Sequence, residues 1–363
     1  MIGPFMRLLT VFLLLLSSSI STAQANYDAE VVVEGLDVPW ALTQLPGGGW
    51  LITERSGQLI YFKDGKKSLV QGTPSVFFAG QGGLLDVELH PDFTENHLLF
   101  LSYAKGDAGN NALTLYKATF NQDAMALENG TDIFSITPGK DTPVHYGGRI
   151  AVTNDALLLA SGDGFDYRES AQIKNSMLGK VLRMGLNGKV KADNPFAADD
   201  NAAFVWTLGH RNPQALLFDV QSGVVYSHEH GPAGGDEINI IKKGLNYGWP
   251  VITNGKDYSG ANISPFKEYP GMQQPLLDWT PSIAPSDMLL YRGNKFAELN
   301  GHLLVTTLKT RELRLVKLKE GKVAEQVTLL THLDERLRGI EQDQQGDIYL
   351  LTDSGKLLLL TQL

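Results

Sequence analysis

The feature of this sequence that most constrains the fold is a recurring unit of short β-like runs joined by glycine-rich turns. The first complete copy runs from Trp40 through the turn at Gly47–Gly49 to Glu54, and a closely similar segment, Ile340–Asp353, returns near the end of the chain. Further copies begin near residues 84, 149, 215 and 286. The chain thus holds about six repeats of roughly 55 residues each, and β-repeats of this length indicate a propeller with four-stranded blades.

We therefore predict an all-β fold, namely a six-bladed β-propeller with four-stranded antiparallel blades. The early run Glu30–Val33 and the C-terminal strands are expected to complete one blade between them. The sequence has no long amphipathic helical pattern, which argues against an α/β fold, and a β-sandwich is the alternative. The insertions at 122–142 and 189–203 are predicted to be loops within one domain. A propeller gathers loops from every blade around a central channel, so site residues should be scattered along the sequence.

The N-terminal 25 residues have the pattern of a secretory signal peptide. Arg7 supplies a positive charge, Leu8–Leu16 is a short apolar core, and a small polar segment ends at Ala23–Ala25. We expect cleavage before Asn26 and export to the periplasm, which leaves residues 26–363 as a single mature domain. An uncleaved anchor helix is the alternative, although the apolar run is short for crossing a bilayer. We expect no membrane span after cleavage.

Composition excludes several kinds of partner and site. The 363-residue chain has no cysteine, so it can form neither a disulfide nor a thiolate metal site. Its net charge of −9 argues against nucleic acid or anionic lipid as a partner. The sequence also lacks a glycine-rich phosphate loop followed by a helix, which argues against ATP or NAD as a ligand.

Two loops rich in glycine, proline, histidine and carboxylates flank one apolar β-like run. They are Gly209–Gln214 and Ser227–Asn239, and we expect them to face one cavity. In the second loop, Gly231–Pro232 exposes carbonyl oxygens that no strand can pair, and Asp236–Glu237 adds carboxylates. Hard oxygen ligands of this kind favour calcium. Two histidines in the same loop give only a weak zinc signal, because no third ligand accompanies them.

Two positions carry residue types suited to acid–base or redox chemistry. His145 precedes two glycines at the start of a predicted strand, and its imidazole is a candidate general base. Arg211 and Asn212 precede Pro213, which holds them in extended or turn geometry, and they offer fixed donors to an anionic or quinoid ligand. The alternatives are a solvated loop histidine and a surface arginine beside a turn-forming asparagine.

A glutamine and three basic residues lie at other repeat or strand ends. Gln81 opens the second repeat in front of two glycines, where an ordinary hairpin turn is the alternative. Lys309 follows the predicted strand 303–308, and Arg336 and Arg338 share one face if the chain is extended. Gathered in one cavity of an acidic protein, these cations would bind a multiply charged anion, and the alternative for each is a solvated face.

Ten short motifs occur in order from about Gly35 to the C-terminus. They are Pro39–Trp40, Thr53–Arg55, Gly80–Asp86, His90–Phe93, His145–Arg149, Gly209–Gln214, His230–Pro232, Gly235–Asn239, Asn246–Pro250 and Ile283–Pro285. In this combination the chain resembles the soluble PQQ-dependent sugar dehydrogenases of the glucose/sorbosone dehydrogenase family. It lacks the long insertions associated with dimer contacts in the glucose-specific members, so we expect a monomer.

The resemblance implies a propeller that binds PQQ and calcium and oxidises aldose sugars to lactones, with electrons passing to an external acceptor. It implies that His145 is the general base and that Arg211 stabilises charge developing on the quinone. The cofactor contacts it implies are Gln81, Arg211, Asn212, Lys309, Arg336 and Arg338. The calcium ligands it implies are the carbonyls of Gly231 and Pro232 at a catalytic ion, and Glu237, Tyr247 and Asp257 at a structural ion.

Two functions from other classes compete with this interpretation. A calcium-dependent propeller lactonase would activate water on a sugar lactone, but it would have no use for Lys309, Arg336 and Arg338. A non-catalytic propeller that binds a glycan or a protein would leave His145 beside two glycines unexplained. In a redox-dye assay with an aldose, dye reduction only in the presence of PQQ and calcium would exclude both of these alternatives.

Overall fold

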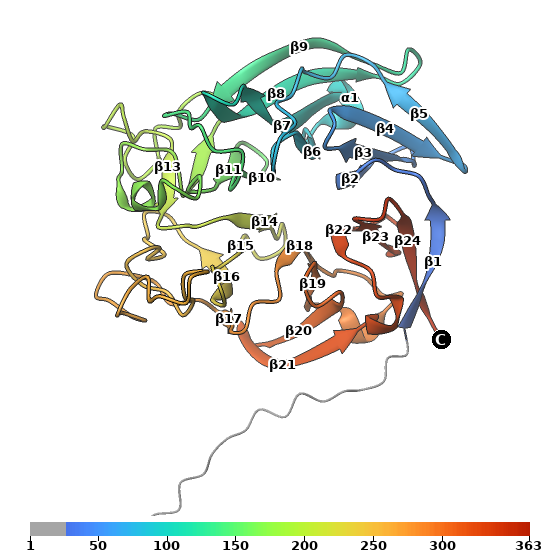
Figure 1. Cartoon of the computed structure of the whole chain (residues 1–363). Helices are drawn as coiled ribbons and strands as arrows, with labels where there is room; N and C mark the ends of the chain where they lie inside the picture. The colour runs from blue at the N-terminus through green and yellow to red at the C-terminus, as the bar shows by residue number, and fades with distance from the viewer. Residues whose placement is uncertain (1–26) are drawn as a thin grey trace, which may run out of the picture.

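The structure, a computed structural model, describes residues 27–363 and arranges 24 strands as six four-stranded antiparallel sheets around a central axis (Figure 1). Five sheets are simple meanders of strands that follow one another in the chain. This arrangement confirms the predicted six-bladed propeller. The predicted signal peptide, residues 1–25, lies outside the described residues.

The strands of the first three blades, from the central axis outward, are β2 (Pro39–Gln44), β3 (Trp50–Glu54), β4 (Gln58–Lys63) and β5 (Lys66–Val70), then β6 (Leu84–Leu89), β7 (Leu98–Gly106), β8 (Asn111–Asn121) and β9 (Ala126–Ser135), then β10 (Gly147–Val152), β11 (Leu157–Ser161), β12 (Lys180–Met184) and β13 (Val205–Leu208).

The strands of the other three blades are β14 (Pro213–Phe218), β15 (Val225–Glu229), β16 (Asp236–Ile241) and β17 (Leu277–Trp279), then β18 (Pro285–Leu290), β19 (Leu303–Thr307), β20 (Leu313–Lys319) and β21 (Lys322–Leu329), then β22 (Leu337–Gln342), β23 (Ile348–Thr352), β24 (Leu357–Gln362) and β1 (Tyr27–Val33). The helical segments are short, namely α1 (Phe93–Asn96), η1 (Arg168–Gln172), η2 (Ala297–Leu299) and η3 (Thr331–Leu333). No helix within residues 27–363 is long and apolar enough to cross a membrane.

The ring closes where the two ends of the described chain meet. Strand β1 pairs antiparallel with β24, in a register that runs from Tyr27 opposite Gln362 to Val33 opposite Leu357. The sixth blade therefore takes three strands from the end of the chain and its outermost strand from the beginning. This confirms that the two predicted segments complete one blade.

One of the two predicted loop insertions is wrong. Residues 122–142 contain β9, the outermost strand of the second blade, which pairs with β8. Most side chains of β9 are exposed, so its sequence, Ala126–Ser135, lacks the apolar alternation that marks a half-buried strand. Residues 189–203 contain no helix or strand, as predicted.

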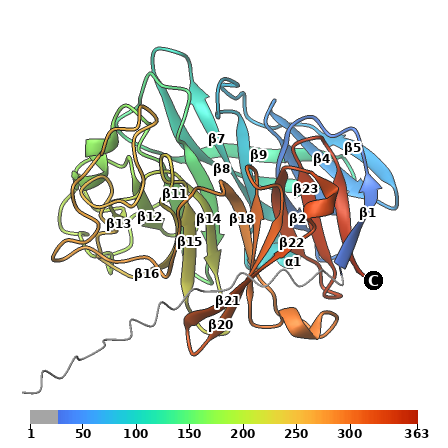
Figure 2. The same cartoon turned by 60° about the horizontal axis from the view of Figure 1, so that its bottom comes forward.

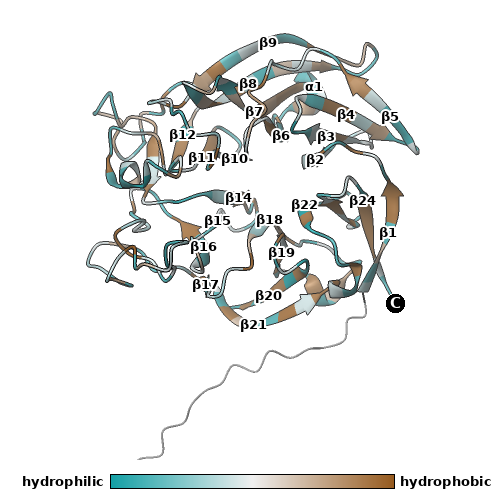
Figure 3. Cartoon of the chain, viewed as in Figure 1, coloured by the Kyte–Doolittle hydropathy of each residue, from teal (hydrophilic) through white to brown (hydrophobic). Residues whose placement is uncertain are grey.

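Apolar side chains pack between neighbouring blades, and glycine turns let the strands reverse. Leu51, Leu99 and Leu157, from three successive blades, are fully buried in one cluster. Figure 3 shows brown, hydrophobic segments along strands of the blades. In the turn between β2 and β3, Gly49 has a φ of +87° and a Cβ there would lie 2.8 Å from the Tyr61 ring. Only glycine fits that position without displacing the ring.

A buried arginine joins the inner strands near the central axis. The guanidinium of Arg149, on β10, lies 3.3 Å from a carboxylate oxygen of Asp86 on β6 and 3.3 Å from one of Asp287 on β18. It also donates to the carbonyl oxygens of Gln214 (2.8 Å) and Ser286 (3.0 Å). Burial raises the pKa of Asp287 to about 6, although Arg149 opposes that rise.

The hydrogen bonds and ion pairs around Arg149, which we call the Arg149 hub, also include the two remaining inner strands, β2 and β22. The Arg149 guanidinium lies 4.0 Å from the centre of the Trp40 ring on β2, in cation–π geometry. The Ile340 amide on β22 donates to Asp287 (3.1 Å). All six inner strands, which lie around the centre in Figure 1 and partly side by side in Figure 2, are therefore linked by one polar network. The loops that leave these strands surround the site described next.

Candidate active site

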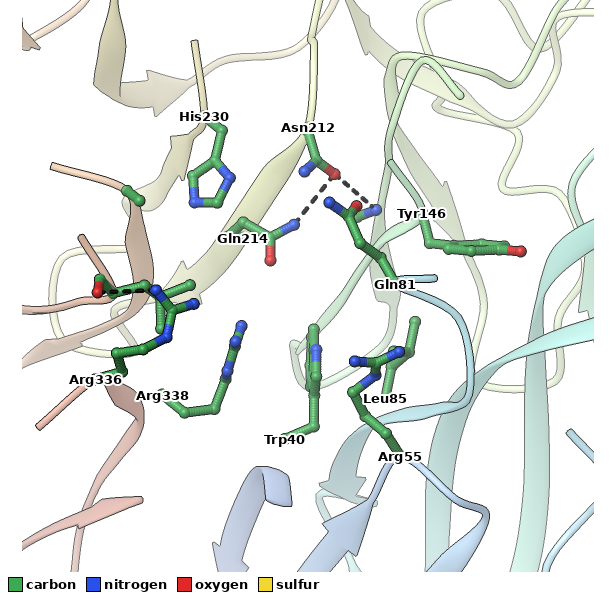
Figure 4. A pocket seen from close by; sticks show the side chains of 13 residues that line it. Trp40, Arg55, Gln81, Leu85, Tyr146, Asn212, Gln214, His230, Arg336 and Arg338 are labelled. Atoms are coloured by element: carbon green, nitrogen blue, oxygen red, sulfur yellow. Dashed lines mark hydrogen bonds between the residues drawn. The ribbon is translucent and has the colours of Figure 1, made fainter. Parts of the chain in front are cut away.

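A cavity of about 300 Å³ lies at one end of the inner strands, and we call it the central cavity. It is lined by Trp40, Arg55, Gln81, Leu85, Tyr146, Gly147, Asn212, Gln214, His230, Ala284, Leu308, Arg336 and Arg338 (Figure 4). These residues come from all six blades or from the loops between them. The predicted gathering of distant sequence positions therefore occurs.

A second cavity of about 250 Å³, the outer cavity, adjoins the first. Its lining includes His145 and Arg211, whose chain neighbours Tyr146 and Asn212 line the central cavity. The rest of its lining is Asp163, Phe165, Asp166, Arg168, Glu169, Pro232, Trp249, Asp257, Tyr258 and Ile263. The two cavities together form a site with a candidate base at their boundary.

His145 is held in an unusual backbone conformation by the loop around it. Its φ is +51°, the left-handed region that residues with a side chain rarely adopt. Its amide donates to the side-chain oxygen of Gln81 (2.7 Å), and the Gln81 amide donates to the Pro143 carbonyl (2.7 Å). Gly162 packs closely against this loop. A Cβ at position 162 would lie 2.2 Å from the His145 carbonyl oxygen, so only glycine fits there. Gln81 therefore fixes the loop that aims His145.

The imidazole of His145 forms a dyad with Asp163. Nδ1 lies 2.7 Å from Oδ1 of Asp163, which also accepts the Phe165 amide (2.8 Å). The other Asp163 oxygen accepts the indole N–H of Trp249 (2.8 Å). Burial lowers the pKa of His145, Asp163 opposes that shift, and Arg211 adds to it. A neutral imidazole that donates from Nδ1 has a free lone pair on Nε2, which is the arrangement of a general base.

Asp163 and Trp249 were not singled out from the sequence. Asp163 is fully buried and lies between two glycines directly after strand β11. The signal in the sequence is an aspartate between two glycines at the end of an apolar strand. An acid expected to be buried there needs a partner, and this could have identified Asp163. Trp249 gave no such signal, because its role depends on packing against a different blade.

Arg211 and Asn212 lie directly before β14 of the fourth blade, and their side chains line different cavities. The Arg211 amide donates to Glu229, and its guanidinium donates to the carbonyls of His230 (3.0 Å) and Gly231 (2.6 Å). The Asn212 side-chain oxygen accepts the Gly147 amide (3.2 Å) and so ties the fourth blade to the third. Arg211 thereby brings a positive charge to the outer cavity beside His145.

The Gly231–Pro232 turn lies where the sequence placed it, next to Arg211. The Gly231 amide donates to Asp236 (2.9 Å), and a Cβ on Gly231 would lie 2.2 Å from the Gly234 carbonyl, so only glycine fits this close turn. Its carbonyl oxygen is buried and accepts a cationic donor. Oxygens of that kind are suitable ligands for a hard cation.

Three arginines line the central cavity. Arg336 and Arg338 both pair with Asp353, at 2.7 and 2.8 Å, and Figure 4 shows them on one side of the cavity. Arg55, which the sequence reasoning missed, lies on the other side and donates to the Gly82 carbonyl (2.8 and 3.2 Å). Burial lowers the pKa of Arg55, and the neighbouring Arg338 adds to this. The cavity therefore carries more cationic than anionic groups, in a chain of net charge −9.

Lys309 does not line either cavity. Its amide donates to the Ile283 carbonyl (3.2 Å) and its side chain is exposed at the rim, while its neighbour Leu308 lines the central cavity. The Leu308 carbonyl accepts a hydrogen bond from Arg336 (3.1 Å). The structure thus brings Arg336 and Arg338 together and leaves Lys309 just outside them.

The predicted structural metal ligands are divided between two places. Glu237 and Tyr247 line a small cavity of about 20 Å³, together with Glu229. Asp257 lines the outer cavity instead, 3.9 Å from Arg168. The Tyr247 hydroxyl donates to Ile240 and accepts the Lys242 amide, so Tyr247 could offer a metal only its carbonyl oxygen.

The small cavity has two carboxylates, Glu229 and Glu237, which is fewer than a calcium site made of side chains alone would need. Burial raises the pKa of Glu237, and the nearby Glu229 adds to that rise. A cavity of this size can hold one water molecule or ion. Within residues 27–363, however, no three His, Asp or Glu side chains are grouped as metal ligands. Any ion there would rely partly on carbonyl oxygens or water.

Comparison with known proteins gives concordant results. Residues 36–360 match the family model for Glucose / Sorbosone dehydrogenase. Aldose sugar dehydrogenase YliI of Escherichia coli is 37% identical over 355 residues, which cover 95% of this chain and 96% of that protein. The crystal structure of the soluble aldose sugar dehydrogenase from Escherichia coli in the apo-form has a TM-score of 0.90 at 36% identity, covering 93% of this chain and 100% of that chain.

A structure with a bound cofactor is also similar. The PQQ-bound form of aldose sugar dehydrogenase from Streptomyces coelicolor has a TM-score of 0.77 at 25% identity, with 95% of this chain and 99% of that chain covered. The sequence and the fold therefore point to the same group of proteins.

Proposed function

The chain belongs to the glucose/sorbosone dehydrogenase family, and on that premise we propose that it oxidises aldose sugars at the anomeric carbon with PQQ and calcium as cofactors. The observation that carries this proposal is the His145–Asp163 dyad at the boundary between a cationic cavity and an open, polar one. The product would be a lactone, and an external acceptor would take the electrons. We also propose that the protein is exported to the periplasm and acts as a monomer.

The central cavity fits an anionic cofactor. PQQ carries three carboxylates, and Arg55, Arg336 and Arg338 present guanidinium groups from two sides of the cavity. Planar guanidinium groups match carboxylates well. Gln81 and Asn212 would supply further polar contacts, and the exposed side chain of Lys309, next to Leu308 of the cavity, would add a positive charge. When bound there, PQQ would supply the two-electron acceptor that no side chain of this protein offers.

The calcium ligands that fit best are main-chain oxygens. The Gly231 carbonyl already accepts the Arg211 guanidinium, and the Pro232 residue lines the outer cavity beside it. For a second ion we propose Glu237 and the Tyr247 carbonyl, because both line the small cavity, where Glu229 adds a second carboxylate. Arg211 lines the same cavity, but within residues 27–363 it forms no ion pair with Glu237. Asp257 lies apart from these two, in the outer cavity.

The protein's own residues supply the acid–base chemistry. His145 would accept the proton of the anomeric hydroxyl at Nε2, and Asp163 would stabilise the imidazolium that forms. Arg211 would hold the substrate or stabilise negative charge that develops beside it. Phe165 contacts the His145 ring edge-on, with ring centres 5.1 Å apart, and limits the ring's motion.

The proposal is tested by dye-linked oxidation of an aldose by the apo-protein, with PQQ and calcium added separately and together. Dye reduction only when both are present would support the dehydrogenase. His145→Ala should then lower kcat by about 10²–10⁴-fold, the usual contribution of a general base. Hydrolysis of a sugar lactone with calcium alone would instead favour the lactonase, and no activity in either assay would favour a binding propeller.

A further inference from the structure

A buried lysine lies behind His145 and lines neither cavity. Lys140 is only 2% exposed, and its Nζ donates to Asn111 Oδ1 (3.2 Å), to the Val144 carbonyl (2.9 Å) and to the Thr142 carbonyl. Its three donors thus meet three neutral oxygens, and within residues 27–363 no carboxylate is hydrogen-bonded to it, although Asp163 and Asp141 lie nearby. A buried ammonium without such a partner is costly, so its retention calls for a reason.

The oxygens that Lys140 binds belong to the loop that carries His145. Thr142 and Val144 point their carbonyls at Nζ, while Pro143 between them points its carbonyl at the Gln81 amide. The loop is therefore held from two opposite sides. The left-handed φ of His145 is unfavourable for a residue with a side chain and persists only when its surroundings enforce it.

A third side of the loop is held through Tyr146. The Lys140 Nζ lies 3.5 Å from the centre of the Tyr146 ring, and the Tyr146 hydroxyl donates to the same Asn111 oxygen (2.6 Å). Lys140, Asn111 and Tyr146 thus form one buried network under the peptide that precedes His145. This network connects the second blade to the third, because Asn111 begins β8.

We propose that Lys140 is a positioning residue: its ammonium fixes the loop that carries His145 and presents a positive charge to that imidazole. The consequence for sugar oxidation rests on the proposed function, but the effect on His145 does not. The titratable and charged groups that act on His145 are Asp163, Arg211, Lys140 and His230, and burial lowers the pKa of His230 to about 4, which leaves it neutral at pH 7. The other charged residues of the same cavity are Asp166, Arg168, Glu169 and Asp257. Asp163 favours the imidazolium, whereas Lys140 and Arg211 favour the neutral base.

Burial lowers the pKa of Lys140 itself to about 7, and the nearby carboxylates of Asp163 and Asp141 oppose that shift. Lys180 provides a matched control, because burial lowers its pKa to about 7 as well and its Nζ also meets three carbonyls, those of Ser170, Ala171 and Leu178. Lys180 differs in holding a loop that does not carry His145.

The test is a pair of NMR titrations of the apo-protein labelled with ¹³C at histidine Cε1 and lysine Cε. Lys140→Met keeps the length and burial of the side chain but removes its charge, so the pKa of His145 should rise. Lys180→Met should leave the pKa of His145 unchanged. An unchanged His145 pKa in Lys140→Met, or an equal change in Lys180→Met, would overturn the proposal.

A second measurement keeps the test valid if Lys140→Met does not fold. In Lys180→Met, one lysine Cε signal should still titrate near pH 7, and it must then belong to Lys140. The His145 signal should respond to that same titration. If no lysine titrates near neutral pH, or if His145 does not respond, the proposal fails. These arms need neither PQQ nor sugar, so they stand apart from the proposed function.

In the loaded enzyme, Lys140→Met should lower kcat by roughly ten- to a hundredfold, because a small misplacement of a reacting group is costly. The KM for the sugar and the Kd for PQQ should change little, since Lys140 lines neither cavity. The acid limb of kcat/KM should move to higher pH, following the raised pKa of His145. A change in KM alone, with kcat and the pH profile intact, would contradict a positioning role.

Discussion

Replacing Asp163 by asparagine should damage catalysis without weakening cofactor binding. Asp163 accepts three hydrogen bonds, from His145 Nδ1 (2.7 Å), Trp249 Nε1 (2.8 Å) and the Phe165 amide (2.8 Å). A carboxylate can accept all three, but an asparagine has only one acceptor oxygen and an NH₂ group. At least one of the three donors must therefore face the NH₂ group.

The two ways of placing that amide both impair the dyad. If the NH₂ group faces His145, Nδ1 must become an acceptor, the ring proton moves to Nε2, and the base no longer has a free lone pair in the cavity. If it faces Trp249, a buried N–H loses its partner at a cost of about 1–3 kcal/mol, and the imidazolium loses its charged partner. Loss of a working general base predicts a fall in kcat of about 10²–10⁴-fold.

The assay is dye-linked aldose oxidation at saturating PQQ and calcium, with the Kd for PQQ measured in parallel. Asp155→Asn is the control, because Asp155 is exposed outside both cavities and its substitution makes the same change of charge. We expect Asp155→Asn to keep kcat within about threefold of wild type, as surface substitutions usually have small effects. A kcat for Asp163→Asn within the same limit, or an equal loss in Asp155→Asn, would refute the dyad.

Three further predictions concern cofactor binding and stability. Arg338→Met should raise the Kd for PQQ roughly ten- to a hundredfold in calorimetric titration, since a hydrogen bond to a charged group is worth about 1.5–3 kcal/mol; an unchanged Kd would contradict the assignment. Arg149→Met should lower the free energy of unfolding by about 3–5 kcal/mol in urea, because it leaves Asp86 and Asp287 without their buried partner; a loss below about 1 kcal/mol would argue against the hub. The folded pKa of Lys180 is about 7, whereas an unfolded lysine titrates near 10.4, so the unfolded chain binds one more proton between these values and stability rises with pH there. Lys180→Met lacks this dependence, so its stability relative to wild type should fall by about 1.4 kcal/mol per pH unit from pH 7.5 to 9.5, and parallel stability curves would show the account to be wrong.

The fold could be predicted from the sequence because its signals are local. Short apolar runs and glycine turns such as Gly47–Gly49 recur along the chain, and each of these signals lies within a few neighbouring residues. The missed strand, Ala126–Ser135, lies at the outer edge of its blade with most side chains exposed. Solvent allows polar residues there, so no apolar period marks the strand.

The site could be predicted where a residue has a distinctive chain neighbourhood. His145 stands before two glycines and Arg211 stands two residues before Pro213, and the structure brings both to the outer cavity. Asp163, Trp249 and Arg55 owe their roles to partners on other blades, which no short motif records. Pairing across blades is set by the closure of the ring, so it becomes visible only in three dimensions.

Metal ligands were the hardest positions to predict. The Gly231 carbonyl could be proposed because a Gly–Pro turn frees it from strand pairing. The grouping of Asp257 with Glu237 was implied by the family resemblance, and the structure places the two in different cavities. The path of the loop between β16 and β17 determines which cavity Asp257 lines. The length and composition of that loop do not reveal its path.

The central claim is tested most directly by a single turnover without any dye. The apo-protein would be titrated to saturation with PQQ in the presence of calcium, and one equivalent of an aldose would be added under anaerobic conditions while visible absorbance is recorded. The account predicts saturable binding of one PQQ per chain and a sugar-dependent absorbance change of cofactor reduction that is much slower in Asp163→Asn. Failure of PQQ to bind, or an absorbance that does not respond to any aldose, would contradict it.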